Sequence, residues 1–311
     1  MPDIPLAVPQ ADGAVRLSDW GLILAEGPDA AAFLNGQLTQ DMLHLADAPA
    51  LLAGYCSPKG RLLATFVVWQ HAPQTIALAC SADLLAATLK RLSMYVLRAK
   101  CKLSDASAAW PLYGLAGPSA DALLQGSLAD AEGARGSVGA TQVMRLCTAG
   151  GVPRYLWAGA PAPALNALSA EVWQWLEVCS GVPRIVAATA DQFVPQMLNL
   201  ELLGAVNFKK GCYPGQEVVA RSQYRGTIKR RTYLMRSAAP LSAGVEVFHS
   251  DDPGQPAGRV VLGASLPGAG HAALVELKMA SIGGGSLHAD SAGGALLQPA
   301  PLPYALAELA D

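Results

Sequence analysis

Apolar residues in the first half of the chain form short runs that are separated by turn residues. Gly21–Glu26 is one such run, ended by a Gly-Pro pair, and Asp29 can then cap a helix that continues through Leu34. Leu51–Cys56 and Arg61–Trp69 are strand-like runs joined by the turn sequence Ser-Pro-Lys-Gly. The pattern predicts strands that alternate with short helices up to about residue 160.

Two longer segments have the periodicity of amphipathic helices. Ser81 follows a predicted strand at Thr75–Cys80 and is a suitable N-cap for a helix whose apolar residues recur every three or four positions as far as Val96. The second helix is predicted from about Leu165 to Cys179, after which a glycine and a proline end it.

The two tryptophans of the second helix cannot both belong to its apolar stripe. At about 100° per residue, Trp173 lies roughly 160° from Trp175 around the helix axis. Leucines and valines of the helix fall on the same face as Trp175. We therefore expect Trp175 in the core and Trp173 in the lining of a cleft.

The composition changes after residue 237. Residues 240–311 are rich in Gly, Pro, Ala and Ser, with short apolar runs at Val245–Phe248, Arg259–Leu262 and Ala272–Leu277. Short strands with turn residues between them are typical of a small β-barrel. Because the earlier strands and helices lack the regular spacing of a doubly wound fold, the predicted class is α+β, with a body at residues 1–237 and a C-terminal β-barrel domain at residues 238–311.

Composition argues against membrane and metal-binding classes. The chain is 52% hydrophobic and 15% charged, but it has no apolar run of 18 or more residues and no basic-then-apolar leader pattern at its start. Its six cysteines have wide, irregular spacings and no C-x-x-C motif. We expect a cytoplasmic protein with free thiols, no membrane association and no metal site of its own.

Positive charge is concentrated in one segment of an acidic chain. Seven basic residues and one acid lie between Lys209 and Arg231, a local charge of +6 against a net charge of −2. Such a segment favours a specific anionic ligand over general nucleic-acid binding.

Cys212 lies inside this basic segment, in a loop that we expect to lead into a helix beginning at Pro214. A helix N-terminus and neighbouring cations both favour a thiolate over a thiol. The flanking Gly211 and Gly215 allow the backbone to approach a ligand closely. We therefore expect an exposed, reactive sulfur at Cys212, whereas four cysteines in strand-like runs are expected to be structural (Cys56, Cys80, Cys101, Cys147).

No conventional catalytic constellation accompanies this thiol. The five histidines are scattered, so a Cys–His hydrolase is disfavoured. The Gly-rich stretches do not follow a strand and open a helix, so nucleotide-binding fingerprints are absent from the sequence.

The Cys212 segment resembles the signature of the YgfZ family. The matching residues are the run KGCYPGQE at Lys210–Glu217, then Val219-Ala220-Arg221 and Tyr224-Arg225-Gly226. Further blocks resemble the family in the same order, at Leu17–Gly27, Phe33–Asp41, Ser57–Phe66, Arg98–Lys102 and Phe193–Asn207.

The resemblance implies a folate-binding α+β body, with two subdomains around a central cavity, and a C-terminal β-barrel, as in the glycine-cleavage T-protein. It implies a tetrahydrofolate or related folate as cofactor and Cys212 as the catalytic or cluster-contacting thiol, facing that cavity. Aromatic faces can stack on the pterin or benzoyl ring, and the basic residues can pair with the glutamate tail. The residues expected to bind the folate are Trp20, Trp173, Lys210, Tyr213, Gln216, Glu217, Arg221 and Arg225.

One departure from the related aminomethyltransferases bears on activity. Their pterin-binding glutamate stands two positions before the glycine that matches Gly181, where this chain has Cys179. Their catalytic aspartate also has no convincing counterpart. A conventional turnover enzyme is therefore not the leading expectation.

Three functions stay open on the sequence. The first is a folate-binding accessory protein that supports assembly or repair of iron–sulfur enzymes and affects tRNA modification indirectly, with those enzymes or assembly proteins as partners. The second is a folate-dependent one-carbon transferase. The third is a tRNA-binding module that uses the basic segment together with Tyr213, Tyr224 and Tyr233.

Overall fold

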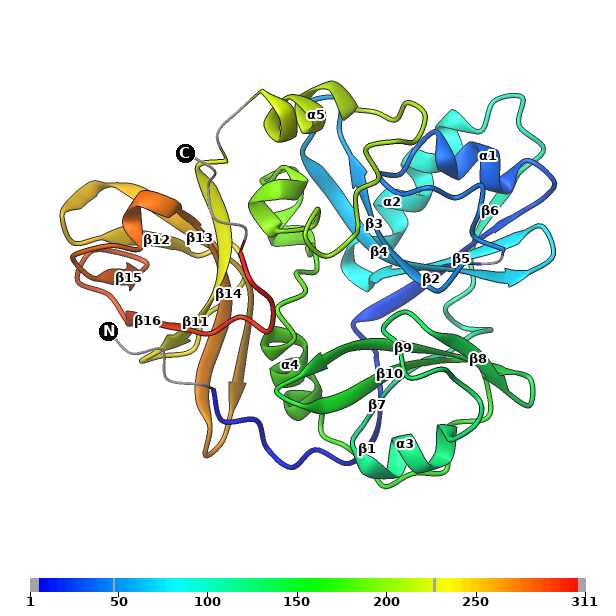
Figure 1. Ribbon diagram of the computed structural model, residues 1–311, viewed down its shortest axis with the longest axis horizontal. Helices are drawn as coiled ribbons and strands as arrows, with labels where there is room; N and C mark the ends of the chain where they lie inside the picture. Colours follow the sequence, from blue (N-terminus) through cyan, green and yellow to red (C-terminus); the bar gives the residue numbers. More distant parts are fainter. Residues whose placement is uncertain (1–5, 47, 226–227, 307–311) are drawn as a thin grey trace.

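The computed structural model describes residues 6–46, 48–225 and 228–306. Within them the chain forms two open five-stranded sheets and one closed six-stranded barrel. The two open sheets lie one above the other, and the barrel stands beside them (Figure 1). The expected α+β class with a C-terminal barrel is confirmed.

The first open sheet carries the strands that the N-terminal pattern predicts. Its order is β3-β4-β5-β2-β6, and every neighbouring pair is antiparallel. Apolar residues dominate both faces of β2 and β5, because one face packs on helices and the other on the second sheet. The strands are β2 (Trp20–Glu26), β3 (Leu51–Cys56), β4 (Leu62–Ala72), β5 (Thr75–Ser81) and β6 (Lys102–Asp105).

The second open sheet has the order β1-β7-β10-β9-β8, again antiparallel throughout. A hydrophobic cluster between the two sheets contains residues of both, including Leu22 and Trp69 from the first and Met144 and Leu156 from the second. The strands are β1 (Gly13–Arg16), β7 (Leu112–Ala116), β8 (Arg135–Val138), β9 (Thr141–Ala149) and β10 (Val152–Ala158).

The helices cover the sheets or join the parts of the molecule. The predicted second long helix begins at Ala170 rather than Leu165, because the Ser169 hydroxyl caps it by accepting a hydrogen bond from the Val172 N–H. The helices are α1 (Ala30–Asn35), α2 (Ala82–Tyr95), α3 (Pro118–Leu124), α4 (Ala170–Cys179) and α5 (Gln216–Tyr224), with 3₁₀ turns at Ala187–Thr189, Pro195–Leu198 and Met279–Ser281.

The barrel closes in the order β11-β14-β13-β12-β15-β16. Its first strand spans Arg230–Ser237 and therefore precedes the change in composition at residue 238. The strands are β11 (Arg230–Ser237), β12 (Glu246–His249), β13 (Asp252–Leu266), β14 (Gly270–Lys278), β15 (Leu287–Ala289) and β16 (Leu296–Ala300).

Helix α4 lies between the barrel and the second open sheet (Figure 1), so more than one of its faces is buried. Trp175 packs in the cluster that includes Val261 and Leu274 of the barrel. Trp173, on another face, packs between the two open sheets and is only 2% exposed. Gly114 permits this packing, because a Cβ atom there would lie 2.6 Å from the indole ring. Periodicity separated the two indoles but did not reveal that both sides are covered.

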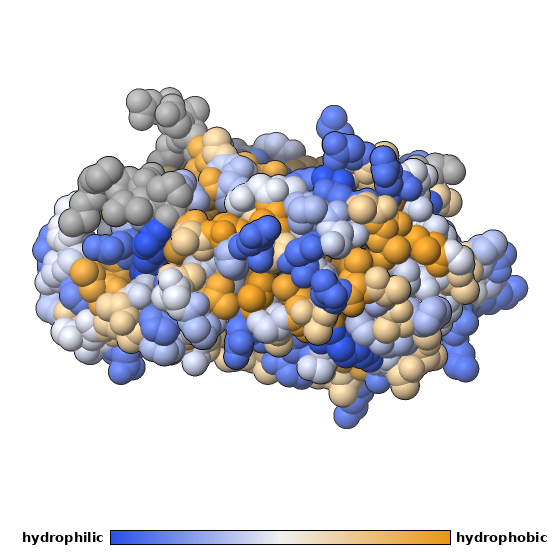
Figure 2. Space-filling view, turned by 90° about the horizontal axis from the view of Figure 1, so that it is seen from below, coloured by the Kyte–Doolittle hydropathy of each residue, from blue (hydrophilic) through white to orange (hydrophobic). Residues whose placement is uncertain are grey.

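No helix among the described residues is long and apolar enough to cross a bilayer. Figure 2 shows one face of the molecule, where hydrophobic residues gather in patches between hydrophilic ones.

Candidate functional site

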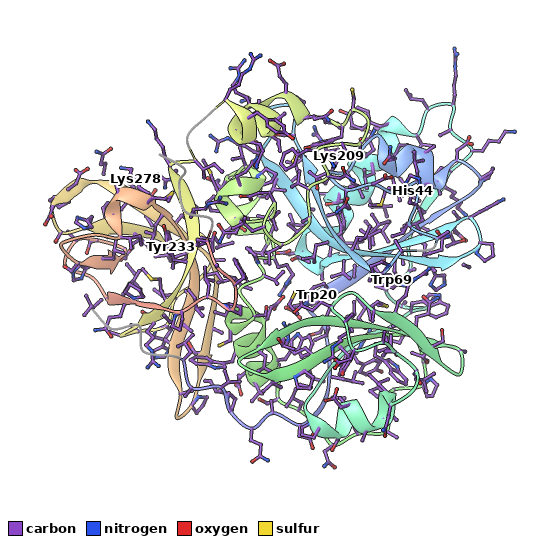
Figure 3. The ribbon with its side chains drawn as sticks, viewed as in Figure 1. Trp20, His44, Trp69, Lys209, Tyr233 and Lys278 are labelled. Carbon is purple, nitrogen blue, oxygen red and sulfur yellow. The ribbon has the colours of Figure 1, made fainter. Side chains whose placement is uncertain are left out.

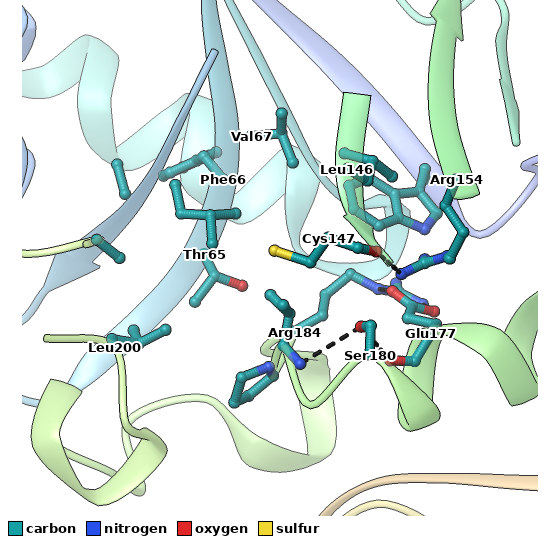
Figure 4. Close-up of a pocket in the computed structure, with 16 residues that line it drawn as sticks. Thr65, Phe66, Val67, Leu146, Cys147, Arg154, Glu177, Ser180, Arg184 and Leu200 are labelled. Atoms are coloured by element: carbon teal, nitrogen blue, oxygen red, sulfur yellow. Dashed lines mark hydrogen bonds and ion pairs between the residues drawn. The ribbon is translucent and has the colours of Figure 1, made fainter. Parts of the chain in front are cut away.

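A central cavity opens where the two open sheets meet the end of α4. Its cavity volume is about 60 Å³, or about 600 Å³ of empty space when open solvent at its mouth is included, and its surface is mostly apolar. Figure 4 shows strands of both sheets and the chain after α4 converging on it. The apolar part of the wall is formed by Leu52, Phe66, Val67, Leu146 and Leu200.

Arg184 and Glu177 form a buried ion pair in the cavity wall. The Arg184 Nε donates to Glu177 Oε1 at 2.7 Å and Nη2 donates to Oε2 at 3.1 Å, so the guanidinium occupies both carboxylate oxygens. The other Arg184 N–H groups reach Asp19 Oδ2 at 2.7 Å and Ser81 Oγ at 2.9 Å. The carboxylates of Glu177 and Asp19 raise the pKa of Arg184 even though burial opposes the shift. This arginine is fully engaged and holds α2, α4 and β2 together.

The same ion pair separates the central cavity from a second, more open pocket. That pocket, of about 1000 Å³, lies between the body and the barrel and also includes Glu177 and Arg184 in its lining. Ser81 stands at the predicted N-cap position of α2, but its hydroxyl donates to the Ile185 carbonyl oxygen and accepts from Arg184 instead of capping the helix. Ser81 therefore does not cap α2 with its side chain, but links the helix N-terminus to the segment after α4.

Arg154 is the second arginine of the cavity, and it is bonded quite differently. Its side chain comes from β10, is 3% exposed and lies over the Trp173 ring at 4.6 Å from the ring centroid. Nη1 donates to the Cys147 carbonyl oxygen at 3.3 Å, while Nε has no hydrogen-bond partner among the described residues. Burial lowers the pKa of Arg154, and Glu177 opposes that shift from a distance. Arg154 is thus a buried cation without a carboxylate partner in the described part of the chain.

Trp20 lines the same cavity from the first residue of β2. Figure 3 places its side chain at the centre of the molecule, between the two open sheets. The Arg184 guanidinium lies 4.8 Å from its ring centroid, and its buried Nε1–H finds no acceptor among the described residues. Two residues of the wall, Trp20 and Arg154, therefore hold buried N–H groups without a hydrogen-bond partner among the described residues, which is unusual for buried polar groups.

Two cysteines near the cavity are neutral thiols. Cys147 lines the cavity, and burial with the nearby Glu132 raises its pKa to about 12. Cys179, the last residue of α4, is buried, and desolvation raises its pKa to about 12. The expectation of a purely structural role for Cys147 overlooked its place in the wall, while Cys56 and Cys80 are fully buried as expected.

The Cys212 loop is built against the turn between β3 and β4. Gly215 has a φ of 80°, and a Cβ atom there would lie 2.4 Å from the Ser57 carbonyl oxygen. Helix α5 begins at Gln216, so the prediction that it starts at Pro214 is wrong. Gly215 serves as N-cap in a left-handed conformation that only glycine adopts without strain. Cys212 itself is exposed, as expected.

Lys210 ties this loop to α1. Its Nζ donates to the carbonyl oxygens of Asn35 and Leu38, and it lies 5.0 Å from the ring centroid of the buried Tyr213. Burial lowers the pKa of Lys210 to about 8, while Asp41 and Cys212 act in the opposite direction. The ammonium group is therefore within electrostatic reach of the exposed sulfur and also has a structural role.

The predicted site residues separate into two groups. Trp20 lines the central cavity, and Trp173 lies behind its wall under Arg154. The loop and α5 residues are not among those that line the cavity, so the expectation that the Cys212 sulfur faces it is not met. In Figure 3, Lys209 lies near α5, well above Trp20. The residues of this second group are Lys210, Cys212, Tyr213, Gln216, Glu217, Arg221 and Arg225.

Several cations of the basic segment are already paired. Arg231 and Glu201 form an ion pair whose side chains are each 5% exposed, and Arg230 bonds to the buried Glu276. On the surface of α5, Arg221 and Glu217 lie 3.4 Å apart. The charge available to a nucleic acid is therefore smaller than the sequence count indicates. The motif position Gly226 lies outside the described residues.

Sequence reasoning missed Glu177, Arg184 and Arg154. A usable pattern existed for two of them, because Arg154 is the one charged residue of β10 and Glu177 is the one charged residue in the buried run 175–179 at the end of α4. Arg184 follows the end of α4 in an irregular segment, where periodicity carries no information.

The chain is similar to known proteins along most of its length. The GCVT N-terminal domain family matches residues 6–155. The chain is 36% identical to the tRNA-modifying protein YgfZ of Edwardsiella ictaluri over 244 residues, which are 72% of this chain and 71% of that protein. It is 30% identical to the YgfZ protein of Sodalis glossinidius over 94% of this chain and 93% of that protein.

A solved structure has the same fold. The glycine cleavage system aminomethyltransferase T from Bartonella henselae superposes with a TM-score of 0.73 at 18% identity, over 94% of this chain and 87% of that one. At this identity the likeness establishes the arrangement of sheets, helices and barrel.

Proposed function

This chain belongs to the YgfZ family, and from that premise we propose that it is a folate-binding accessory protein that supports the assembly or repair of iron–sulfur enzymes. Its relatives are named tRNA-modifying proteins. We propose that the effect of this chain on tRNA modification is indirect and arises through an iron–sulfur enzyme that modifies tRNA.

The central cavity supports a folate as the ligand. Its apolar wall suits an aromatic ring, and the indole of Trp20 offers a face for stacking. Its unpaired donors on Trp20 and Arg154 suit the carbonyl and carboxylate oxygens that a folate carries. A reduced folate supplies a one-carbon unit when it is bound. The unpaired donors beside an apolar cavity are the observation that carries the proposal.

We propose that Trp173 supports folate binding indirectly, through its contact with Arg154. The indole lies behind the wall, and its ring supports the guanidinium from below at 4.6 Å. Its role in folate binding is therefore to position a cation rather than to stack on the ligand.

The exposed loop around Cys212 supports a second, separate role. A thiol on the surface can meet another protein, which a thiol inside the cavity cannot do. Lys210 fixes the loop and places a positive charge near the sulfur. Gln216, Glu217 and Arg221 belong to α5, which follows the loop, and Arg225 is its C-cap residue. We assign Cys212 to contact with the cluster or the partner enzyme, and the α5 residues to that contact.

An accessory role fits the cavity better than aminomethyl transfer does. Glu177 is the only carboxylate among the residues that line the described cavity, and Arg184 occupies both of its oxygens. Cys179 carries a thiol with a pKa of about 12 and cannot replace a carboxylate in proton transfer. We also propose that the body and barrel act as two domains, divided before β11 and not at residues 237 and 238 as the composition suggests, because β11 is a strand of the barrel.

Replacement of Trp20 by alanine tests the ligand and its place. Wild-type protein is expected to bind tetrahydrofolate and 5-formyltetrahydrofolate in a 1:1 ratio in titration calorimetry. Trp20→Ala is expected to weaken binding about 10-fold or more, since it removes both an aromatic face and an N–H donor. Trp110→Ala, which alters a tryptophan outside this cavity, serves as the matched control. Wild-type protein that binds neither folate would refute the proposal.

A further inference from the structure

The end of α2 exposes large apolar side chains that its amphipathic pattern does not explain. The helix buries Leu85 and Leu92. Met94 and Tyr95, in its last turn, are 58% and 44% exposed, and Leu97, just beyond the helix, is 87% exposed. Single exposed apolar side chains are ordinary, but three within four residues form a patch of the kind that binds another molecule. We refer to these three residues as the α2 patch.

Leu97 also has an unfavourable backbone conformation. Its φ is 43°, in the left-handed region, directly after the C-cap residue Val96. Glycine or asparagine usually occupies this position, because the Cβ atom of an aliphatic residue is strained there. Neither burial nor local conformation therefore favours a leucine at this point of the chain. A contact with another molecule gives a strained, exposed apolar side chain a purpose.

Positive charge surrounds the α2 patch. Residues 84–104 contain five basic residues and no acid, although the whole chain has a net charge of −2. Four of the five are exposed and form no ion pair within the described part of the chain, namely Lys90, Arg98, Lys100 and Lys102. An apolar centre with a charged rim is the usual composition of a protein–protein interface. The complementary surface is acidic.

The apolar side chains favour an acidic protein surface over a nucleic acid. A nucleic acid binds through contacts to its phosphates and through stacking of its bases on aromatic rings. Met94 and Leu97 provide neither kind of contact. Methionine, tyrosine and arginine are all enriched in protein–protein interfaces.

The α2 patch and the Cys212 loop are connected through β3. Tyr95 lies within electrostatic reach of the buried Tyr55 hydroxyl of that strand. Leu38 pairs with Tyr55, and its carbonyl oxygen accepts a hydrogen bond from Lys210 Nζ at 2.8 Å. A partner that contacts the exposed thiol can therefore also contact the end of α2.

We propose that the α2 patch and the four cations around it form a docking surface for an acidic face of the partner protein that Cys212 contacts. This inference rests on the proposed function and specifies where that partner binds and which charge its surface carries. The apolar centre supplies most of the affinity, and the cations orient the approaching partner.

Photo-crosslinking in cells tests the docking. The photoreactive residue p-benzoylphenylalanine replaces Met94 in one strain and Val218, an exposed residue of α5, in another. Mass spectrometry then identifies the attached molecules. Both positions are expected to yield the same protein, and the segment attached at Met94 is expected to contain more acidic than basic residues.

Substitutions around the Met94 probe test the two parts of the surface. Leu97→Asn is expected to lower the crosslink yield about 10-fold or more, as loss of a central apolar side chain does in an interface. Leu296→Asn is the matched control, because Leu296 is a 39% exposed leucine of the barrel, and it is expected to leave the yield unchanged. Arg98→Glu is expected to lower the yield, whereas Arg98→Lys is expected to preserve it.

The same asparagine variants, without the probe, are compared for tRNA modification in a deletion strain. Leu97→Asn is expected to reduce thio-modified tRNA although its Tm equals or exceeds that of the wild type, since asparagine adopts the left-handed conformation more easily than leucine. Leu296→Asn is expected to restore modification fully.

Several results would overturn the inference. They are a ribonuclease-sensitive product or a lipid attached at Met94, no product at Met94, different proteins at the two probe positions, and full restoration of tRNA modification by Leu97→Asn. If Cys212→Ser abolishes modification and Leu97→Asn does not reduce it, only this inference fails. If neither variant reduces modification, the proposed function fails as well.

Discussion

Replacing Cys212 by serine is expected to reduce thio-modified tRNA in a deletion strain to the level seen without any copy of the gene. The change removes the exposed sulfur of a free cysteine but almost no volume. Surface substitutions of this kind usually alter stability by less than about 0.5 kcal/mol. The loss would therefore reflect chemistry at the sulfur and not unfolding. Mass spectrometry of tRNA nucleosides from the complemented strain measures the effect.

Cys101→Ser is the matched control for this experiment. Cys101 is a half-exposed free cysteine outside the motif, and its replacement is expected to restore tRNA modification fully. If Cys212→Ser restores tRNA modification as well as the wild-type gene does, the proposed role of the thiol is wrong. It would leave folate binding in the central cavity untouched, because the two sites share no residues.

Arg184→Met is expected to destabilise the protein by about 3–5 kcal/mol, the usual cost of removing one partner of a buried ion pair. The Glu177 side chain is only 6% exposed and would keep a charge without a counterion. Asp19 and Ser81 would lose hydrogen bonds at the same time. Urea unfolding followed by tryptophan fluorescence measures the change.

A double variant checks the physical reason. Glu177→Leu combined with Arg184→Met replaces the pair by apolar side chains and is expected to recover much of the lost stability, because no buried charge is left alone. Stability of Arg184→Met equal to that of the wild type would contradict the assignment of this ion pair as a central support of the fold.

Local patterns were sufficient for most of the fold. Leu51–Cys56 forms β3 with the predicted bounds, and Ser81 is the N-cap residue of α2. Three of the barrel strands, β12, β13 and β14, lie at the predicted apolar runs, because alternation and turn residues are local properties. No run was predicted for β11, β15 or β16. Boundaries that depend on caps were less predictable. Helix α4 starts five residues late, and α5 starts after a left-handed Gly215.

The site was less predictable because it depends on which elements meet. The motif around Cys212 is contiguous in sequence, so its exposure could be inferred from its composition. The central cavity combines Trp20, Arg154 and Arg184, which are more than a hundred residues apart at the extremes. Helical periodicity distinguished Trp173 from Trp175 but gave no sign that two layers of structure cover α4. Residue types located the reactive loop, whereas tertiary packing determined which charges are free.

The central claim is that the folate lies in the cavity between the open sheets, separate from the exposed thiol. A crystal structure of the protein grown with 5-formyltetrahydrofolate tests it most directly. We predict ligand density bounded by Trp20, Arg154 and Leu200, with the Cys212 sulfur outside contact distance of the ligand. Density against the Cys212 loop, with the central cavity left to solvent, would contradict the account.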